Sequence, residues 1–228
     1  MEPRGDPLGT ATFAQALASL KRTGCNLLLV GPAYREAHLP ASRRLLGSTD
    51  AETERSRLLV VTDGAGAEER RLGDVDPSTV RTLSYDCPTR GAAAATPVEV
   101  GPTDAATDVS QPDLATLCRR IESVITEIAA EGAGLAPAEL RVCFDSLVPL
   151  LETFDERDVF AFLHALTAAT SDVGAMAHYH LPVPADDPLV RTISPLFEAV
   201  IELRVTSRGP EQRWRLTDED VVTEWLPV

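Results

Sequence analysis

Apolar residues follow two different spacings along this chain, and together they predict strands that alternate with helices. Runs that are apolar at nearly every position are typical of strands buried on both faces of a parallel sheet. Such runs, some of them weaker, occupy residues 25–30, 58–64, 80–85, 140–145 and 174–181. Apolar positions at helical spacing lie around them, at residues 11–23, 39–46, 114–131, 153–169 and 188–197. The alternation predicts an α/β fold, a three-layer sandwich with a mostly parallel sheet.

The C-terminal part has a different pattern. Short apolar segments predict a tail of two or three antiparallel strands, at residues 199–205, 213–216 and 221–226. Gly209 and Pro210 are expected to form a turn within this tail. Because 228 residues can bury one large core and no internal repeat is present, we expect a single domain over residues 1–228.

Two segments are expected to stand apart from the packed core. Residues 1–10 carry several prolines and glycines and are expected to be frayed. Residues 86–111 are rich in Ala, Thr, Pro, Gly and Asp, which predicts a mobile loop with a brief edge strand at 97–100. Ser110 with Asp113 resembles a capping box before the helix that follows.

The chain is strongly acidic, with 35 Asp and Glu against 21 Lys and Arg, and its formal net charge is −14. Such a surface repels phosphates and anionic lipids, so we expect neither nucleic acid nor a membrane as a partner. Lys21 is the only lysine. An acidic, lysine-poor composition is typical of proteins from salt-loving archaea, although an ordinary acidic protein from a GC-rich genome has the same features.

The four cysteines carry no metal-binding or redox motif, because no two of them form a Cys-x-x-Cys pair. Cys25 and Cys143 lie in predicted strands and Cys118 on an apolar helix stripe, so we interpret them as small core residues. The sequence contains no apolar run of 18 residues and no signal peptide. We therefore expect a cytoplasmic protein.

Acidic and hydroxyl side chains follow two of the predicted strands. Asp145 and Ser146 stand at the end of the strand predicted at 140–145, and in many nucleotide-hydrolysing proteins such a strand end holds a magnesium-bound water. An alternative interpretation is structural, because acids often end buried strands and cap the next helix. Thr62 and Asp63 end the second strand, where Asp63 is either a catalytic acid or part of a turn before a glycine.

Several motifs give the chain a resemblance to the RecA/KaiC-like branch of the P-loop ATPases, and more specifically to haloarchaeal proteins labelled HTR-like. The motifs are Asn26–Pro32, Phe144–Leu147, Phe162–His164, Gly174–Leu181 and Trp214–Leu216. The resemblance implies a RecA/KaiC-like sheet and a phosphate loop directly after the first strand. It also implies ATP with Mg²⁺ as the cofactor, with the metal near Asp145.

The segment after the first strand departs from this family pattern. Residues 31–38 contain one glycine and no lysine, and Pro32 lacks one of the N–H groups that a phosphate cradle uses. We therefore expect a non-catalytic regulatory or adaptor protein with no cofactor, acting through a protein partner or through self-association. The alternative is a divergent nucleotide-binding protein that uses Gly31, Arg35 and Ser146.

A related alternative is an ATPase or metal-dependent hydrolase that uses Asp145, Asp63 and His178. Because His178 and His180 alternate along one strand, they face the same side of the sheet. With Asp145 they could bind zinc or iron. No third histidine is expected nearby, since His164 is predicted on a helix and His38 in a loop. Histidines satisfied by hydrogen bonds are the simpler interpretation, and we expect no metal.

Overall fold

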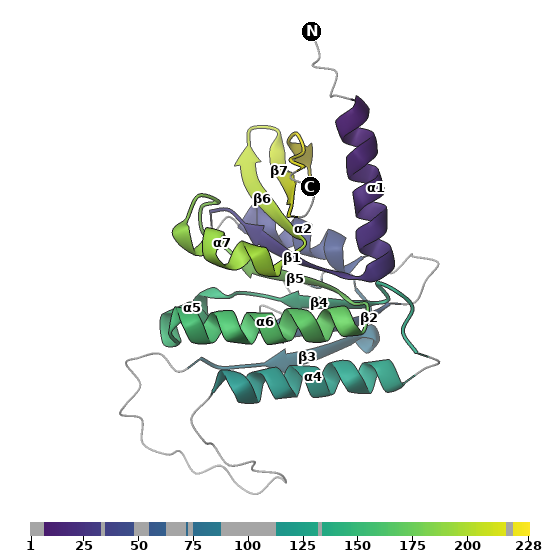
Figure 1. Cartoon of the computed structure of the whole chain (residues 1–228), viewed down its shortest axis with the longest axis vertical. Helices are drawn as coiled ribbons and strands as arrows, with labels where there is room; N and C mark the ends of the chain where they lie inside the picture. The colour runs from purple at the N-terminus through teal and green to yellow at the C-terminus, as the bar shows by residue number, and fades with distance from the viewer. Residues whose placement is uncertain are drawn as a thin grey trace, which may run out of the picture.

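The computed structural model of the chain is shown in Figure 1. It describes residues 7–32, 35–47, 55–62, 72, 75–87, 113–131, 134–217 and 221–228. Asp63, Ser110, the proposed edge strand at 97–100 and most of the loop predicted at 86–111 lie outside the described residues.

The described residues form one sheet of eight strands in the order β3-β2-β4-β5-β1-β6-β7-β8. The strands are β1 (Cys25–Val30), β2 (Ser56–Val61), β3 (Val80–Ser84), β4 (Leu140–Phe144), β5 (Met176–Leu181), β6 (Ala199–Thr206), β7 (Gly209–Leu216) and β8 (Leu226–Pro227). Wherever two of the strands β1 to β6 are neighbours in the sheet, they run parallel to each other. Strands β7 and β8 are antiparallel to their neighbours.

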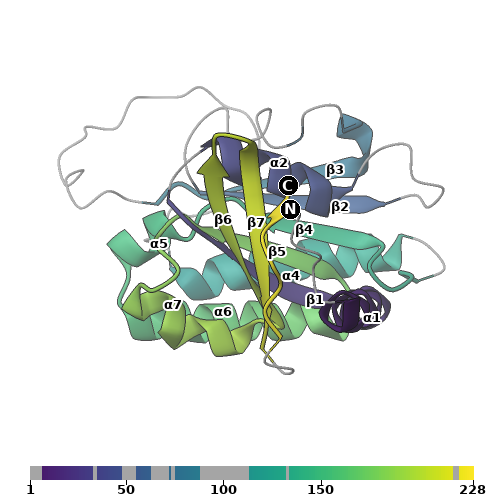
Figure 2. The same cartoon turned by 90° about the horizontal axis from the view of Figure 1, so that it is seen from above.

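Helices cover both faces of this sheet. They are α1 (Pro7–Thr23), α2 (Arg35–Leu46), α4 (Leu114–Ala130), α5 (Val148–Thr153), α6 (Glu156–Asp172) and α7 (Pro188–Ile193), with short 3-10 turns at Pro77–Thr79 and Ser194–Leu196. Figure 2 shows α2 on one side of the sheet and α6 and α7 on the other. The three-layer α/β sandwich with a mostly parallel sheet and antiparallel C-terminal strands is therefore confirmed. None of the helices in the described ranges has both the length and the apolar character needed to cross a membrane.

The core is divided by the sheet, because successive side chains of a strand point to opposite faces. Helices α4, α6 and α7 pack on one face, against residues such as Val60, Phe144 and Tyr179. Helix α1 and part of α2 pack on the other face, near Leu27 and Leu29 of β1.

The predicted antiparallel tail is present, since β7 is antiparallel to both β6 and β8, and β6 is in addition parallel to β1. Two other sequence predictions need correction. The turn before β7 consists of Ser207 and Arg208, and Gly209 is already the first residue of that strand. At the start of α4, Asp113 is itself the N-cap, because its carboxylate accepts a hydrogen bond from the N–H of Thr116.

The predicted frayed N-terminus is also corrected in part. Residues 1–6 lie outside the described residues, but Pro7 to Thr10 form the start of α1. Pro7 is tolerated there, because the first N–H groups of a helix have no partner within the helix. The helix ends at Gly24, whose φ of 80° lies in the left-handed region that favours glycine.

Candidate functional site

The carboxyl edge of the sheet holds Asp145, which joins the ends of two strands. Its side chain is buried, with 1% of its surface exposed. The Oδ1 atom accepts hydrogen bonds from the backbone N–H of Thr62 at 2.7 Å and from the Thr62 hydroxyl at 2.9 Å. The N–H of Asp145 donates to the carbonyl oxygen of Val60 at 3.0 Å. Asp145 therefore links the end of β4 to the end of β2.

Ser146 continues this link and starts the next helix. Its hydroxyl oxygen accepts a hydrogen bond from the N–H of Val148, the first residue of α5, at 3.3 Å. Its carbonyl oxygen accepts from the Thr62 hydroxyl at 2.5 Å. The residue is 6% exposed. The side chains of Asp145 and Ser146 thus both have hydrogen-bond partners within the protein. Such partners fit the structural interpretation of this strand end, in which these residues hold the strand end and the next helix.

Of the residues considered for nucleotide binding, Ser146 is next to Asp145, whereas Gly31 and Arg35 belong to the segment after β1. Gly31 follows β1, which β5 separates from β4. Its N–H donates to the carbonyl oxygen of Val183 at 2.8 Å, so this group is engaged within the protein. A Cβ atom at Gly31 would lie 2.3 Å from the carbonyl oxygen of Leu203, so only glycine fits. Arg35 is the first residue of α2, and its side chain is outside the described part.

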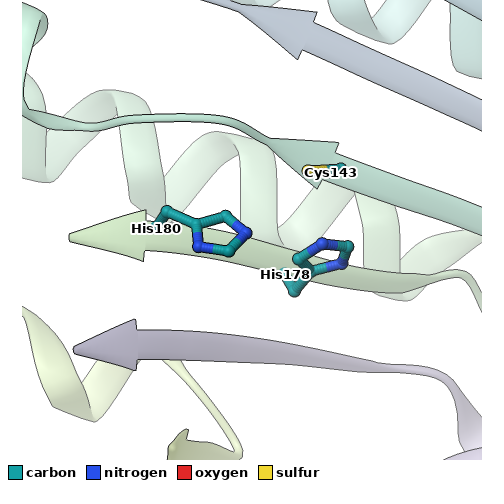
Figure 3. A group of neighbouring side chains, drawn as sticks. All are labelled: Cys143, His178 and His180. Carbon is teal, nitrogen blue, oxygen red and sulfur yellow. The ribbon is translucent and has the colours of Figure 1, made fainter. Parts of the chain in front are cut away.

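A second group of polar side chains is buried between α2 and the sheet. His178 and His180 of β5 contact residues of α2, and Cys143 on β4 is the register partner of His178. Figure 3 shows the three side chains. Their possible ligand atoms all lie within 4.8 Å of one another. All three residues are at most 2% exposed.

Helix α2 adds two further side chains to this group. The Nδ1 atoms of His38 and His180 are 2.9 Å apart, which is hydrogen-bond distance, and the tautomers of the two rings decide which nitrogen donates. The hydroxyl oxygen of Ser42 lies 3.0 Å from Nε2 of His178 and 3.4 Å from Sγ of Cys143. His38, Ser42, Cys143, His178 and His180 are called the histidine–cysteine cluster below.

The cluster differs from the metal site that the sequence suggested. Asp145 is not among the residues that the structure groups with His178 and His180, and Cys143 takes its place. His38 belongs to α2 rather than to a loop, because that helix begins at Arg35 and not at Leu39. The sequence signal for Cys143 was its position in a buried strand, which describes a core cysteine equally well.

Cys87, which lies near the same edge of the sheet, is not an activated nucleophile. Burial raises the pKa of its thiol to about 11, and a hydrogen bond with Thr153 opposes this rise only in part. The negative charges of Asp86 and Asp145 raise the pKa further. Because the thiolate is the reactive form, this environment argues against cysteine-based catalysis at neutral pH.

A groove lies elsewhere on the molecule, between α4 and α6. Its volume is about 430 Å³ and its lining is mostly apolar. The apolar lining residues are Leu114, Ala115, Phe154, Ala161, Phe162 and Ala165. Asp113 and Asp158 are exposed and also line the groove.

The comparison with protein families decides what this chain belongs to. A family of unknown function, DUF7504, matches residues 24–203. The chain belongs to the DUF7504 family. The matched part of this DUF7504 protein runs from the residue before β1 into β6, and it includes Asp145 and the whole histidine–cysteine cluster. No curated protein matched the chain.

Proposed function

We propose that this DUF7504 protein is a non-catalytic relative of the RecA/KaiC-like ATPases that acts as a regulatory or adaptor protein through protein contacts. The observation that carries the proposal is the position of Asp145. In a hydrolase of this kind, an acid at the end of the strand would help to hold a magnesium ion. Here its buried carboxylate accepts two hydrogen bonds from Thr62 and connects β2 to β4.

The segment after β1 supports the same proposal. A triphosphate needs several inward-pointing N–H groups and a lysine for charge neutralisation. Residues 31–38 contain no lysine, Pro32 has no N–H, and the N–H of Gly31 donates to Val183. The net charge of −14 makes a polyphosphate site less favourable still.

Protein contact is the remaining role that the described surface supports. The groove between α4 and α6 has an apolar lining and two acidic residues. These features fit a partner segment with apolar side chains next to a lysine or arginine. We further propose that the protein works in the cytoplasm of a halophilic archaeon. Its acidic, lysine-poor composition and its four cysteines, none of which forms a disulfide, support that setting.

Nucleotide assays with Asp145→Ala test the non-catalytic proposal. Titration calorimetry with ATP and ADP, each with Mg²⁺ in molar KCl, should show no binding heat, and phosphate release should equal the blank. Removing the Asp145 carboxylate should instead lower the free energy of unfolding by about 1–3 kcal/mol, because it leaves the buried N–H of Thr62 without its acceptor, while the Thr62 hydroxyl keeps the carbonyl oxygen of Ser146.

The matched control is Asp155→Ala, which removes an exposed acid whose side chain makes no capping hydrogen bond before α6. This variant should keep the stability of the wild-type protein within about 0.5 kcal/mol. ATP turnover that is present in the wild-type protein and lost in Asp145→Ala, but kept in Asp155→Ala, would overturn the proposal.

A further inference from the structure

We infer that the histidine–cysteine cluster is a zinc site that fastens α2 to the sheet. The inference goes beyond the proposed function and does not depend on it. Four of its residues, His38, Cys143, His178 and His180, offer imidazole nitrogens and a thiolate sulfur. These are the donors that zinc prefers, and four of them complete a tetrahedral site.

The fold brings these donors together from three separate elements. His178 and His180 are two residues apart on β5 and so face the same side. Cys143 lies beside His178 on the neighbouring strand β4. His38 approaches from α2, which covers this face of the sheet. The set is therefore produced by the packing of the helix on two adjacent strands.

Three of the four donors lie near one another, at a wider spacing than in an occupied zinc site, and His38 adjoins this group through His180. Ligands at about 2.0–2.3 Å from zinc are about 3.3–3.6 Å from one another. The Nδ1 atoms of His38 and His180 are 2.9 Å apart. The ligand atoms of Cys143, His178 and His180 lie within 4.8 Å of one another. Binding an ion through all four donors therefore requires Cys143, His178 and His180 to draw together and the His38 side chain to move toward Cys143 and His178.

Burial indicates what kind of zinc site this is. The four donor residues are between 0% and 6% exposed, and they lie among buried Leu, Val and Ala side chains together with Ser42, Arg57 and Arg141. So many buried polar groups are costly unless each is well satisfied. Four protein ligands also leave no open position for substrate, which is typical of structural rather than catalytic zinc. Ser42, close to both Cys143 and His178, is placed to orient them from outside the coordination sphere.

Metal analysis of the untagged full-length chain tests the inference, because a polyhistidine tag would bind the same ions. Protein from zinc-supplemented medium should contain one zinc ion per chain. The chelator-treated protein should take up one Co²⁺ with the intense visible bands of a tetrahedral site and a thiolate-to-cobalt charge-transfer band. X-ray absorption at the zinc edge should show one sulfur and three nitrogen ligands.

Two variants that each replace one proposed zinc ligand, and two matched control variants, test where the ion binds. Cys143→Ser and His180→Gln should weaken Co²⁺ binding by at least about 100-fold, since even partners outside the coordination sphere contribute about 10–100-fold. Cys118→Ser and His164→Gln should bind as the wild type does. They replace a cysteine of α4 and the exposed histidine of α6, on the other side of the sheet.

Three results would overturn the inference. One is a well-folded wild-type protein that takes up neither zinc nor cobalt under reducing conditions. Another is metal bound without a sulfur ligand, and the third is unchanged binding in Cys143→Ser. The absorption spectra of the wild-type protein decide the question even if the variants of the ligands fail to fold. Failure of this test would leave the nucleotide assays of Asp145→Ala unaffected. Those assays examine the strand end at Asp145 and not the histidine–cysteine cluster.

Discussion

Arg57 and Arg141 are neighbours in the register of β2 and β4, yet their surroundings differ sharply. The guanidinium of Arg57 donates to the carbonyl oxygens of Leu46 and Gly47, each at 3.2 Å, and so satisfies the C-terminal end of α2. It also donates to the Thr79 hydroxyl at 2.8 Å. Arg141 is buried with a long 3.4 Å contact to the carbonyl oxygen of Leu45, and burial is the main cause that lowers its pKa to about 10.

The two arginines should therefore respond in opposite ways to replacement by leucine. Arg57→Leu should lower the free energy of unfolding by about 2–3 kcal/mol, because it leaves helix carbonyls unsatisfied. Arg141→Leu should change it by less than about 1 kcal/mol or raise it, because it removes a charge that burial disfavours. Burial of the charged Arg141 side chain lowers the free energy of unfolding at neutral pH, because its folded pKa lies below the ordinary 12.5. This destabilisation declines only above about pH 10, where the folded protein begins to lose the proton. Urea unfolding at pH 7 and fixed salt measures both effects, and a strongly destabilised Arg141→Leu would contradict this account.

At the residue scale, the sequence predicted which side chains are buried better than it predicted their partners. Asp145 was expected to face either a metal or the next helix, and its carboxylate accepts hydrogen bonds from Thr62, the residue after β2. The contact between His38 and His180 was not predictable either, because it depends on how α2 packs across the sheet. Such contacts between distant segments leave no periodic pattern in the chain.

At the element scale, the parallel strands were predicted close to their observed bounds, but β7 (Gly209–Leu216) was expected at 213–216 and β8 (Leu226–Pro227) at 221–226. Helix boundaries were also predicted less well. The strand β1 was predicted at its observed bounds, since a run of six buried residues has few other interpretations. Helix α2 was expected at 39–46 but begins at Arg35. Its first residues, Arg35 to His38, show no apolar spacing, and Pro40 lies inside the helix, where proline usually argues against helix.

The groove between α4 and α6 gives a prediction about a pair of elements. Ala161 of α6 is exposed and lines the groove, so Ala161→Arg should fill it and add a charge without disturbing the core. If a partner docks there, this variant should lose it in affinity capture from the native host, followed by crosslinking. The crosslinked partner segment should carry apolar side chains beside a lysine or arginine.

Ala14→Arg is the control for this experiment, because Ala14 is an exposed residue of α1, outside the groove. It should retain the same partner as the wild type. A partner that is lost equally from both variants, or one that is crosslinked through another face, would show that the groove is not the contact surface.

For the molecule as a whole, the net charge of −14 governs how stability depends on salt. Repulsion among surface carboxylates opposes the compact state, and salt shortens its range from about 10 Å at 0.1 M to about 3 Å at 1 M. The midpoint of thermal unfolding should therefore rise steadily between 0.1 and about 2 M KCl.

A triple variant, Glu152→Gln, Asp172→Asn and Glu224→Gln, removes three exposed negative charges. It should be more stable than the wild type in 0.1 M KCl and gain less from added salt, because less repulsion remains to be screened. A midpoint that does not change with KCl, or equal gains for both proteins, would mean that charge repulsion is not what molar salt relieves.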